Sequence, residues 1–562
     1  MSDNIGPRNG LKSLVDEYRQ AGLSRREFVK RAAVLGLSAP AAASLLAAAT
    51  PRLAMAQETP QQGGRFTEGY DRDFTKMDPV NSGWADPGYN AIYEYVMLRD
   101  ANGAIVPCLA ESWTISDDNL SWTFKIRDGL KFHSGAACTN ANVVEDFNLF
   151  RSAEGGGQNA IFWNAVTDVT AGDGNTVVVK LSKPFAAFPE TLATEYSMIH
   201  NQAARAEAGD QYGATTEDGT GPFTLGEFTP GNQVLFKKWA DYPGSIVPFL
   251  ENKGPAYIDE LRFVPILEVA NRANELEAGG VDAIKNPAPQ DLDRLTSNPD
   301  VVVMEWANPA NLFINLNDQK TELGFDDIRV RQAISHAIDR QGLADAIYFG
   351  HAIATYGPIP SNWKWYEPGV EQFNQFDLEK AKSLLEEAGW TVGSDGIREK
   401  NGVKLSFTLY NWGAQTYGAQ INEAITGMLK DAGVEMKLVT LDTAELFPRV
   451  LDPKAEPVDA FSYEWLWSSP MDVLVIFNSI PNFPFNGDHQ DLKQAFDEWQ
   501  GAATDAELEA AARKAQLIWA EKLPLIPVVT GNVIWAHHKK VHGWTPTQTM
   551  LYPLYNDVWV EQ

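Results

Sequence analysis

The sequence predicts a mixed α/β protein with open sheets, because stretches with the period of a strand alternate with stretches that have the period of a helix. Residues 121–126 alternate polar and apolar side chains, and residues 326–340 repeat apolar side chains at helical spacing. A helical pattern at 420–431 is followed at once by a strand pattern at 434–440. Helices placed between strands favour sheets that are covered by helices.

The strand predictions start from Trp122, Phe124 and Ile126, which alternate with polar residues as in a half-buried strand. The Asp-Asp-Asn sequence at 117–119 predicts the turn before this strand. A second short strand is expected at 177–181, after an Asp-Gly turn.

Three helices are predicted in the second half of the chain. The apolar face of the first consists of Val330, Ala333, Ile334, Ala337 and Ile338. Asp327 is expected to cap this helix, and Asp377 the next one, which ends at Gly389. The third runs from about residue 420 to 431 and stops at Gly433.

The net charge limits the possible partners. The 562 residues carry a formal charge of −28 at pH 7. The first 56 residues hold eight Lys and Arg against four Asp and Glu, or +4, so the remaining 506 residues carry −32. Such a surface repels phosphate backbones and anionic lipids, which argues against nucleic acid or a membrane surface as partner. We expect a soluble monomer that handles a small ligand.

The two cysteines, Cys108 and Cys138, are not arranged as a metal or redox motif, because neither lies in a C-x-x-C pair. In an oxidising compartment they could form one disulfide, which would contribute about 3–4 kcal/mol in the chain-entropy model. Two separate buried thiols are the alternative.

The first 56 residues have the order of an export signal: a basic segment, an apolar run at 32–50 and an Ala-x-Ala cleavage site ending at Ala56. The segment SRREFVK, with Arg25 and Arg26, resembles the twin-arginine signal, with Val29 in place of Leu. The resemblance implies that the twin-arginine translocase exports a folded protein to the periplasm. No cysteine follows the cleavage site, so a lipid anchor is not expected there.

The motifs of common enzymes are missing. The sequence has no Gly-Lys dipeptide, no G-x-S-x-G and no H-E-x-x-H, which argues against a phosphate loop, a serine-hydrolase turn and a zinc-protease site. We therefore predict no catalytic residues, no metal and no cofactor. A binding protein fits this pattern best, and an exported hydrolase with an unrecognised site is the alternative.

Seven short motifs occur in the order seen in the family 5 extracellular solute-binding proteins. These are GG at 63, MDP at 77, PCLAESW at 107, FKIRDGLKFHSG at 124, GTGPFTLGEFTPG at 219, DDIRVRQAISHAIDR at 326 and AKSLLEEAGW at 381. The chain resembles this family, the dipeptide, oligopeptide and nickel binders of ABC importers, over nearly all of the exported part. The resemblance implies a type II periplasmic binding protein that delivers its ligand to an ABC permease in the inner membrane.

The resemblance also implies three lobes that close about a hinge. Lobe I would combine residues 57–98, 219–308 and 523–562. Lobe II would be the insertion at 99–218, and lobe III would span 309–522. The ligand cleft of the family lies between lobes I and III.

The family's peptide binders carry a Trp in this cleft and, three residues later, an Asp that pairs with the α-ammonium of the peptide. Trp465 matches the Trp, and Ser468 stands at the Asp position. A buried ammonium without a carboxylate costs several kcal/mol, and serine supplies no charge. Either Glu464 or Asp472 replaces the missing carboxylate, or the ligand is not a free-amine peptide.

Aromatic residues form the other expected part of the cleft. Those expected to line it are Tyr463, Trp465, Trp467 and Trp412, with Tyr89 and Trp84 on the opposite wall. Such rings stack on sugars or cage cationic groups. We expect a peptide or peptide-like ligand, with an oligosaccharide, or an opine, amine or metal chelate, as alternatives.

Overall fold

The computed structural model describes residues 59–80, 86–152, 160, 162–308, 311–413, 417–451, 455–464 and 490–562. The chain divides into two compact units, residues 1–60 and 61–562. Only residues 59 and 60 of the first unit are described, and the account below concerns the second. No helix in the described ranges is long and apolar enough to span a membrane.

A mixed sheet of twelve strands forms the main framework of the described chain. Ten strands follow one another across it: β10 (Phe223–Thr229), β11 (Gln233–Lys238), β12 (Glu260–Pro265), β1 (Arg65–Tyr70), β13 (Ala283–Lys285), β23 (Ile526–His538), β15 (Leu312–Leu316), β22 (Ala460–Glu464), β20 (Ser406–Trp412) and β21 (Glu435–Leu441). Two more, β14 (Val301–Ala307) and β16 (Ala352–Ala354), pair with β23. β1 runs parallel to β12 and β13, and β20 runs parallel to β21 and β22, so the predicted mixed α/β fold is confirmed.

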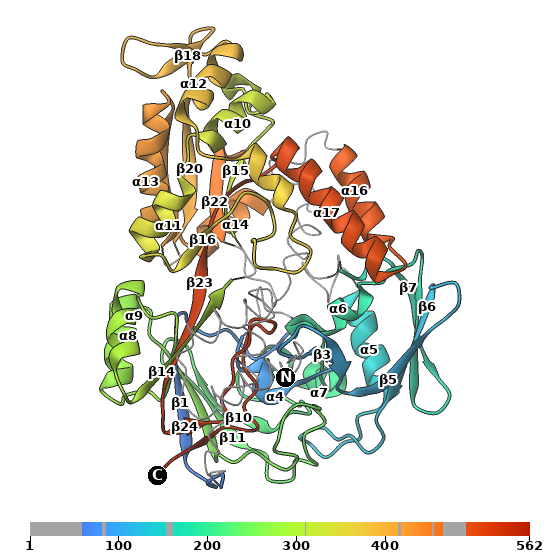
Figure 1. Cartoon of the computed structure of the whole chain (residues 1–562). Helices are drawn as coiled ribbons and strands as arrows, with labels where there is room; N and C mark the ends of the chain where they lie inside the picture. The colour runs from blue at the N-terminus through green and yellow to red at the C-terminus, as the bar shows by residue number, and fades with distance from the viewer. Residues whose placement is uncertain are drawn as a thin grey trace, which may run out of the picture. The chain divides into compact units, whose positions relative to one another are not determined.

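The strand β23 joins the two parts of this sheet. It is thirteen residues long; its first residues pair with β15 and β16, and its last residues pair with β13 and β14 (Figure 1). β14 and β15 also lie in different parts, because β14 pairs with the last residues of β23 and β15 with the first. Side chains at the ends of these strands are therefore brought together where the two parts meet.

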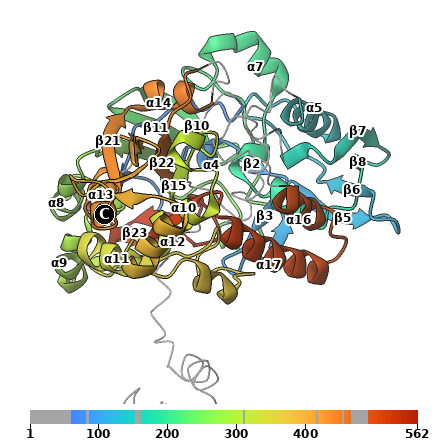
Figure 2. The same ribbon diagram turned by 90° about the horizontal axis from the view of Figure 1, so that it is seen from above.

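A second, antiparallel sheet has the strand order β5 (Ala110–Ile115), β6 (Ser121–Ile126), β8 (Thr176–Leu181) and β7 (Val166–Gly172). The helix α5 (Asn140–Phe150) packs against β7 and β8 (Figures 1 and 2). Both predicted strands are confirmed, and Trp122, Phe124 and Ile126 are buried as their alternation predicts. Asn119, in the predicted turn, has a positive φ of 57°, which Asn tolerates better than most residues.

The predicted helices also form, with one difference. α10 (Ile328–His336), α12 (Leu378–Glu387) and α13 (Gly418–Asp431) correspond to them. The side chains of Asp327 and Asp377 accept backbone hydrogen bonds as N-caps. α10 ends before Ile338, because Asp339 accepts a bond from the Gly342 N–H and starts another helix, α11 (Arg340–Tyr348).

The remaining elements are shorter or lie outside the two sheets. The helices are α4 (Tyr89–Ile92), α6 (Phe188–Leu192), α7 (Gln202–Ala208), α8 (Val269–Glu277), α9 (Leu292–Ser297), α14 (Thr443–Leu451), α16 (Gln490–Gln500) and α17 (Asp505–Lys522). The short strands are β2 (Glu94–Tyr95), β3 (Met97–Arg99), β4 (Ile105–Pro107), β9 (Met198–Ile199), β17 (Thr391–Val392), β18 (Arg398–Lys400), β19 (Val403–Lys404), β24 (Val541–His542) and β25 (Trp559–Val560). α16 and α17 lie side by side in both views (Figures 1 and 2).

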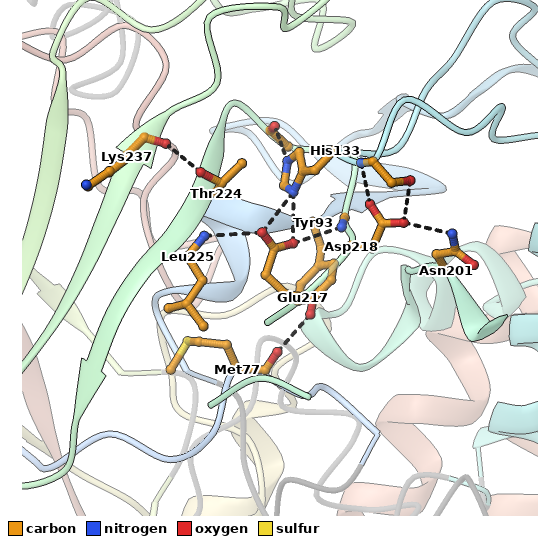
Figure 3. Close-up of polar contacts among 12 residues, drawn as sticks. Met77, Tyr93, His133, Asn201, Glu217, Asp218, Thr224, Leu225 and Lys237 are labelled. Atoms are coloured by element: carbon orange, nitrogen blue, oxygen red, sulfur yellow. Dashed lines mark hydrogen bonds and ion pairs between the residues drawn. The ribbon is translucent and has the colours of Figure 1, made fainter. Parts of the chain in front are cut away.

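Two of the seven motifs meet in a buried polar cluster (Figure 3). His133, from FKIRDGLKFHSG, lies 2.8 Å from Glu217 through Nδ1, and its Nε2 lies 2.9 Å from the Gly221 carbonyl. Asp218 accepts bonds from the Ser134 backbone N–H and hydroxyl and from the Asn201 amide. The cluster fastens the loop before β10 to the turn after β6, which gives these motifs a structural role.

Cys108 and Cys138 are two separate buried thiols, which was the alternative to a disulfide. Burial raises the pKa of each thiol well above its usual range. No disulfide links Cys108 and Cys138, and neither thiol is poised as a nucleophile.

Candidate ligand site

Charged side chains gather where the two parts of the large sheet meet. Because β1 and β13 are parallel, their carboxyl ends lie at one edge, which places Asp71 and Lys285 near each other. Glu464 ends β22 and pairs with Leu312 at the start of β15. We call Asp71, Lys285, Asn308 and Glu464 the junction cluster.

Lys285 is the cation of the junction cluster, and 4% of its surface is exposed. Its Nζ lies 5.1, 5.4 and 5.2 Å from the ring centroids of Tyr70, Trp535 and Tyr552. It forms no hydrogen bond and no ion pair with any residue that the structure describes. Burial lowers the pKa of this lysine, although Asp71, Glu68 and Glu464 oppose the effect.

Asp71 is half-buried and accepts a 2.7 Å hydrogen bond from the Asn286 amide. Burial alone would raise the pKa of Asp71, but the nearby cations outweigh it, with Lys285 first and Arg272 and Arg72 after it. The pKa is therefore lowered, and this carboxylate stays ionised.

Glu464 is the second carboxylate of the junction cluster, and its pKa is raised, whereas that of Asp71 is lowered. It is half-buried, and its Oε1 accepts a 3.4 Å bond from the Asn308 amide. Burial and the Asp71 charge raise the pKa of Glu464 to about 7, against the opposing effects of Lys285 and Asn308. It forms no ion pair within the described part of the chain. The cluster thus offers a cation and a carboxylate that are not neutralised by direct contact.

Tyr463 and Trp412, two of the aromatic residues predicted to line the cleft, differ in how deeply they are buried. Tyr463 is 2% exposed, and its ring stacks on Phe461 with centroids 5.2 Å apart, so it packs within the core. Trp412 ends β20 and is half-buried, and the preceding Asn411 pairs with Ser462 of β22. The register therefore brings Trp412 and Tyr463 next to each other, on neighbouring strands.

Tyr89 is completely buried at the start of α4, and its hydroxyl donates to the Asp78 carbonyl at 3.2 Å. It packs in the core, because a helix turn holds it against the chain segment around Met77. The other predicted cleft residues, Trp84, Trp465, Trp467, Ser468 and Asp472, lie outside the described residues.

The sequence analysis missed Asp71, Lys285 and Asn308. Each directly follows or ends a strand: Asp71 follows β1, Lys285 ends β13 and Asn308 follows β14. The signal available in the sequence was a charged or amide residue at the end of an apolar strand run, a place where open α/β sheets hold ligands.

Ligands of open α/β sheets bind at the carboxyl ends of the strands, which is where Asp71, Lys285 and Asn308 lie. Residues 104–480 match the family model of bacterial extracellular solute-binding proteins, family 5. The match covers more than half of the 562 residues, and the chain belongs to this family.

Curated relatives match along most of their length. The chain is 25% identical over 556 residues to a probable peptide ABC transporter periplasmic-binding protein, y4tO, of Sinorhizobium fredii, covering 93% of this chain and 97% of that protein. It is 26% identical over 502 residues to the glutathione-binding protein GsiB of Escherichia coli K12, covering 84% and 90%.

Solved structures share the fold of type II periplasmic binding proteins. The periplasmic binding protein DppA from Helicobacter pylori, in complex with peptide STSA, superposes with a TM-score of 0.75 at 22% identity, covering 89% of this chain and 99% of that one. AppA from Bacillus subtilis, in complex with a nonapeptide, gives a TM-score of 0.75 at 21% identity, covering 90% and 100%.

Proposed function

We propose that this chain is the periplasmic solute-binding subunit of an ABC importer and that it captures a peptide or peptide-like ligand for a membrane permease. The family membership supports the role, and two relatives are described as peptide and glutathione binders. The ligand class depends on one observation, the carboxylate of Glu464 in the junction cluster.

Glu464 can supply the charge that Ser468 lacks. Its carboxylate lies at the junction, has no cation in ion-pair contact among the described residues and has a pKa of about 7. A ligand ammonium placed beside it would favour the ionised form and form a charge-assisted hydrogen bond. Asp472 is the other candidate for the same role.

The rest of the proposal concerns export and organisation. Residues 1–56 act as a twin-arginine signal, read through Arg25 and Arg26 and cleaved after Ala56, and the mature protein is a periplasmic monomer without a lipid anchor. Lobes I, II and III have the bounds given above. The protein is a carrier without catalytic residues, so it binds its ligand and returns it unchanged.

Ligand panels on the chain without residues 1–56 test the proposal, since that chain contains the whole second compact unit. Tryptophan fluorescence and thermal shift would be measured with dipeptides, N-acetylated dipeptides and oligosaccharides. We expect stabilisation by free-amine dipeptides that is lost on N-acetylation. Stabilisation by oligosaccharides alone would contradict the peptide assignment, and turnover of a bound ligand would favour the hydrolase alternative.

A matched pair of variants tests Glu464 against a control position. Glu464→Gln should lose the preference for a free ammonium, whereas Glu423→Gln, at an exposed position of α13, should keep it. If Glu464→Gln also retains the preference, Asp472 becomes the candidate for the amine site.

A further inference from the structure

Lys285 is a buried cation, and no carboxylate among the described residues pairs with it directly. It is 4% exposed, and within the described ranges its Nζ contacts neither a carboxylate nor a hydrogen-bond acceptor. Long charged side chains are almost never buried unless they are paired. A protein that keeps a lysine in such a place loses stability by doing so, which suggests that the charge serves a ligand.

The surroundings of Lys285 hold it without neutralising it. Tyr70, Trp535 and Tyr552 place their rings within 5.1–5.4 Å of Nζ. Aromatic faces attract a cation but carry no net charge. The rings also fix the direction of the side chain, so the ammonium is presented in one place.

The charged groups near Lys285 have both signs. Arg72 and Arg272 contribute two further cations, and the ionised Asp71 faces all three. Burial raises the pKa of Asp86, beside Arg72, to about 6 and that of the completely buried Glu68 to about 8, so at pH 7 Asp86 is mostly ionised and Glu68 mostly protonated. Protonation of Glu68 removes one of the carboxylates that would otherwise act on Lys285.

Lys285 and Glu464 act on each other at a distance. Each shifts the pKa of the other, yet no ion pair within 4.0 Å joins them. The cluster therefore presents one cation and one carboxylate that do not pair with each other, and a ligand with opposite charges at its two ends matches this arrangement.

We infer that Lys285 binds the carboxylate of the ligand, whose ammonium lies at Glu464. The inference rests on the proposed function and goes further, because it names a second recognition residue. Peptides with both termini free are the ligands that this pair of residues would recognise.

Amidation of the ligand tests this inference, because it removes the carboxylate and leaves the rest unchanged. A pool of free dipeptides and the same pool amidated at the carboxyl end would be titrated against three proteins by calorimetry and thermal shift. The proteins are the wild type, Lys285→Met and Lys237→Met, a control at an exposed position of β11 in the same sheet.

We expect the wild type and Lys237→Met to bind the free pool about 30-fold more tightly than the amidated pool, as for the loss of one partner from a buried charge pair. Lys285→Met should bind both pools with nearly equal affinity. Methionine is close to lysine in length and is apolar, so the variant should fold, and circular dichroism would check it.

Two outcomes would contradict the inference in distinguishable ways. If the amidated pool binds as tightly as the free pool to the wild type, or if Lys285→Met keeps the 30-fold preference, Lys285 does not bind the ligand carboxylate. The proposed function would survive both results. If neither pool binds to the wild type, the proposed function fails, and the inference fails with it.

Discussion

The affinity for a free-amine dipeptide should depend on pH through Glu464. Burial and Asp71 raise the pKa of this group to about 7, so the empty protein holds the carboxylate about half ionised at pH 7. At pH 5 the ionised fraction falls to about 1%, because the pH then lies about two units below the pKa. Only the ionised form attracts the ligand ammonium, so acid should weaken binding.

The expected loss follows from these fractions. Between pH 7 and pH 5 the affinity should fall about 50-fold, which corresponds to about 2.4 kcal/mol at 1.4 kcal/mol for each factor of ten. Above pH 8 the ligand's own α-amino group, with a pKa of about 7.7–8.0, loses its proton and weakens binding again. The affinity should therefore pass through a maximum near pH 7.5.

Calorimetric titrations at pH 5, 6, 7 and 8 would measure this profile for the wild type and for Glu464→Gln. Other nearby groups also titrate in this range, since the pKa of Asp86 is raised to about 6 and that of Glu68 to about 8, mainly by burial. The variant isolates Glu464, because it keeps both of those groups. If the affinity of Glu464→Gln falls as steeply between pH 7 and pH 5 as that of the wild type, Glu464 is not the group responsible and the reasoning is refuted.

Three further predictions concern stability and reactivity. Lys285→Met should raise the free energy of unfolding by about 1–2 kcal/mol in urea titrations, because it removes an unpaired buried charge; a loss of stability would show that the cation is structurally required. Cys108 and Cys138 should fail to react with a thiol reagent until the protein unfolds, and a reductant should leave the Tm unchanged, whereas a Tm lowered by reductant would reveal a disulfide. Burial lowers the pKa of His133, but Glu217 outweighs this effect, and the pKa is raised. The ion pair therefore stabilises the fold fully below about pH 6.5, the pKa of an unperturbed histidine. This stabilisation is lost as the pH rises through the elevated pKa. His133→Gln should cost about 3 kcal/mol at pH 6 and less at pH 9 in denaturant titrations, and an equal cost at both pH values would contradict this.

Local patterns predicted the elements of the fold well. The alternation at Trp122, Phe124 and Ile126 depends only on which side chains face the core, and that strand formed with the expected bounds. The caps at Asp327 and Asp377 depend on contacts within three residues. The split between α10 and α11 was missed because Ala337 and Ile338 continue the apolar spacing while the Asp339 cap starts a new helix.

The candidate site was much less predictable, because it is assembled from strand ends that are far apart in the sequence. Lys285 and Glu464 lie on β13 and β22, which come together only through the pairing of β23 and β15. The sequence analysis named Glu464 through a family motif but had no local reason to connect it with Lys285. The complete burial of Tyr89 was not predicted, because an aromatic residue in a polar stretch has the same pattern whether it packs inside or faces a ligand.

The position of β23 in the chain also determines when folding can finish. This strand lies at the centre of the large sheet, yet it spans residues 526–538 of 562. At about 5–20 residues per second, a ribosome needs roughly 25–90 seconds to make the residues between the end of β1 and the start of β23, and the sheet lacks its central strand for all of that time. The two parts of the sheet therefore cannot join until β23 has been made. For a protein that we propose to cross the membrane already folded, the interval between release from the ribosome and export is the period in which the ligand site is formed.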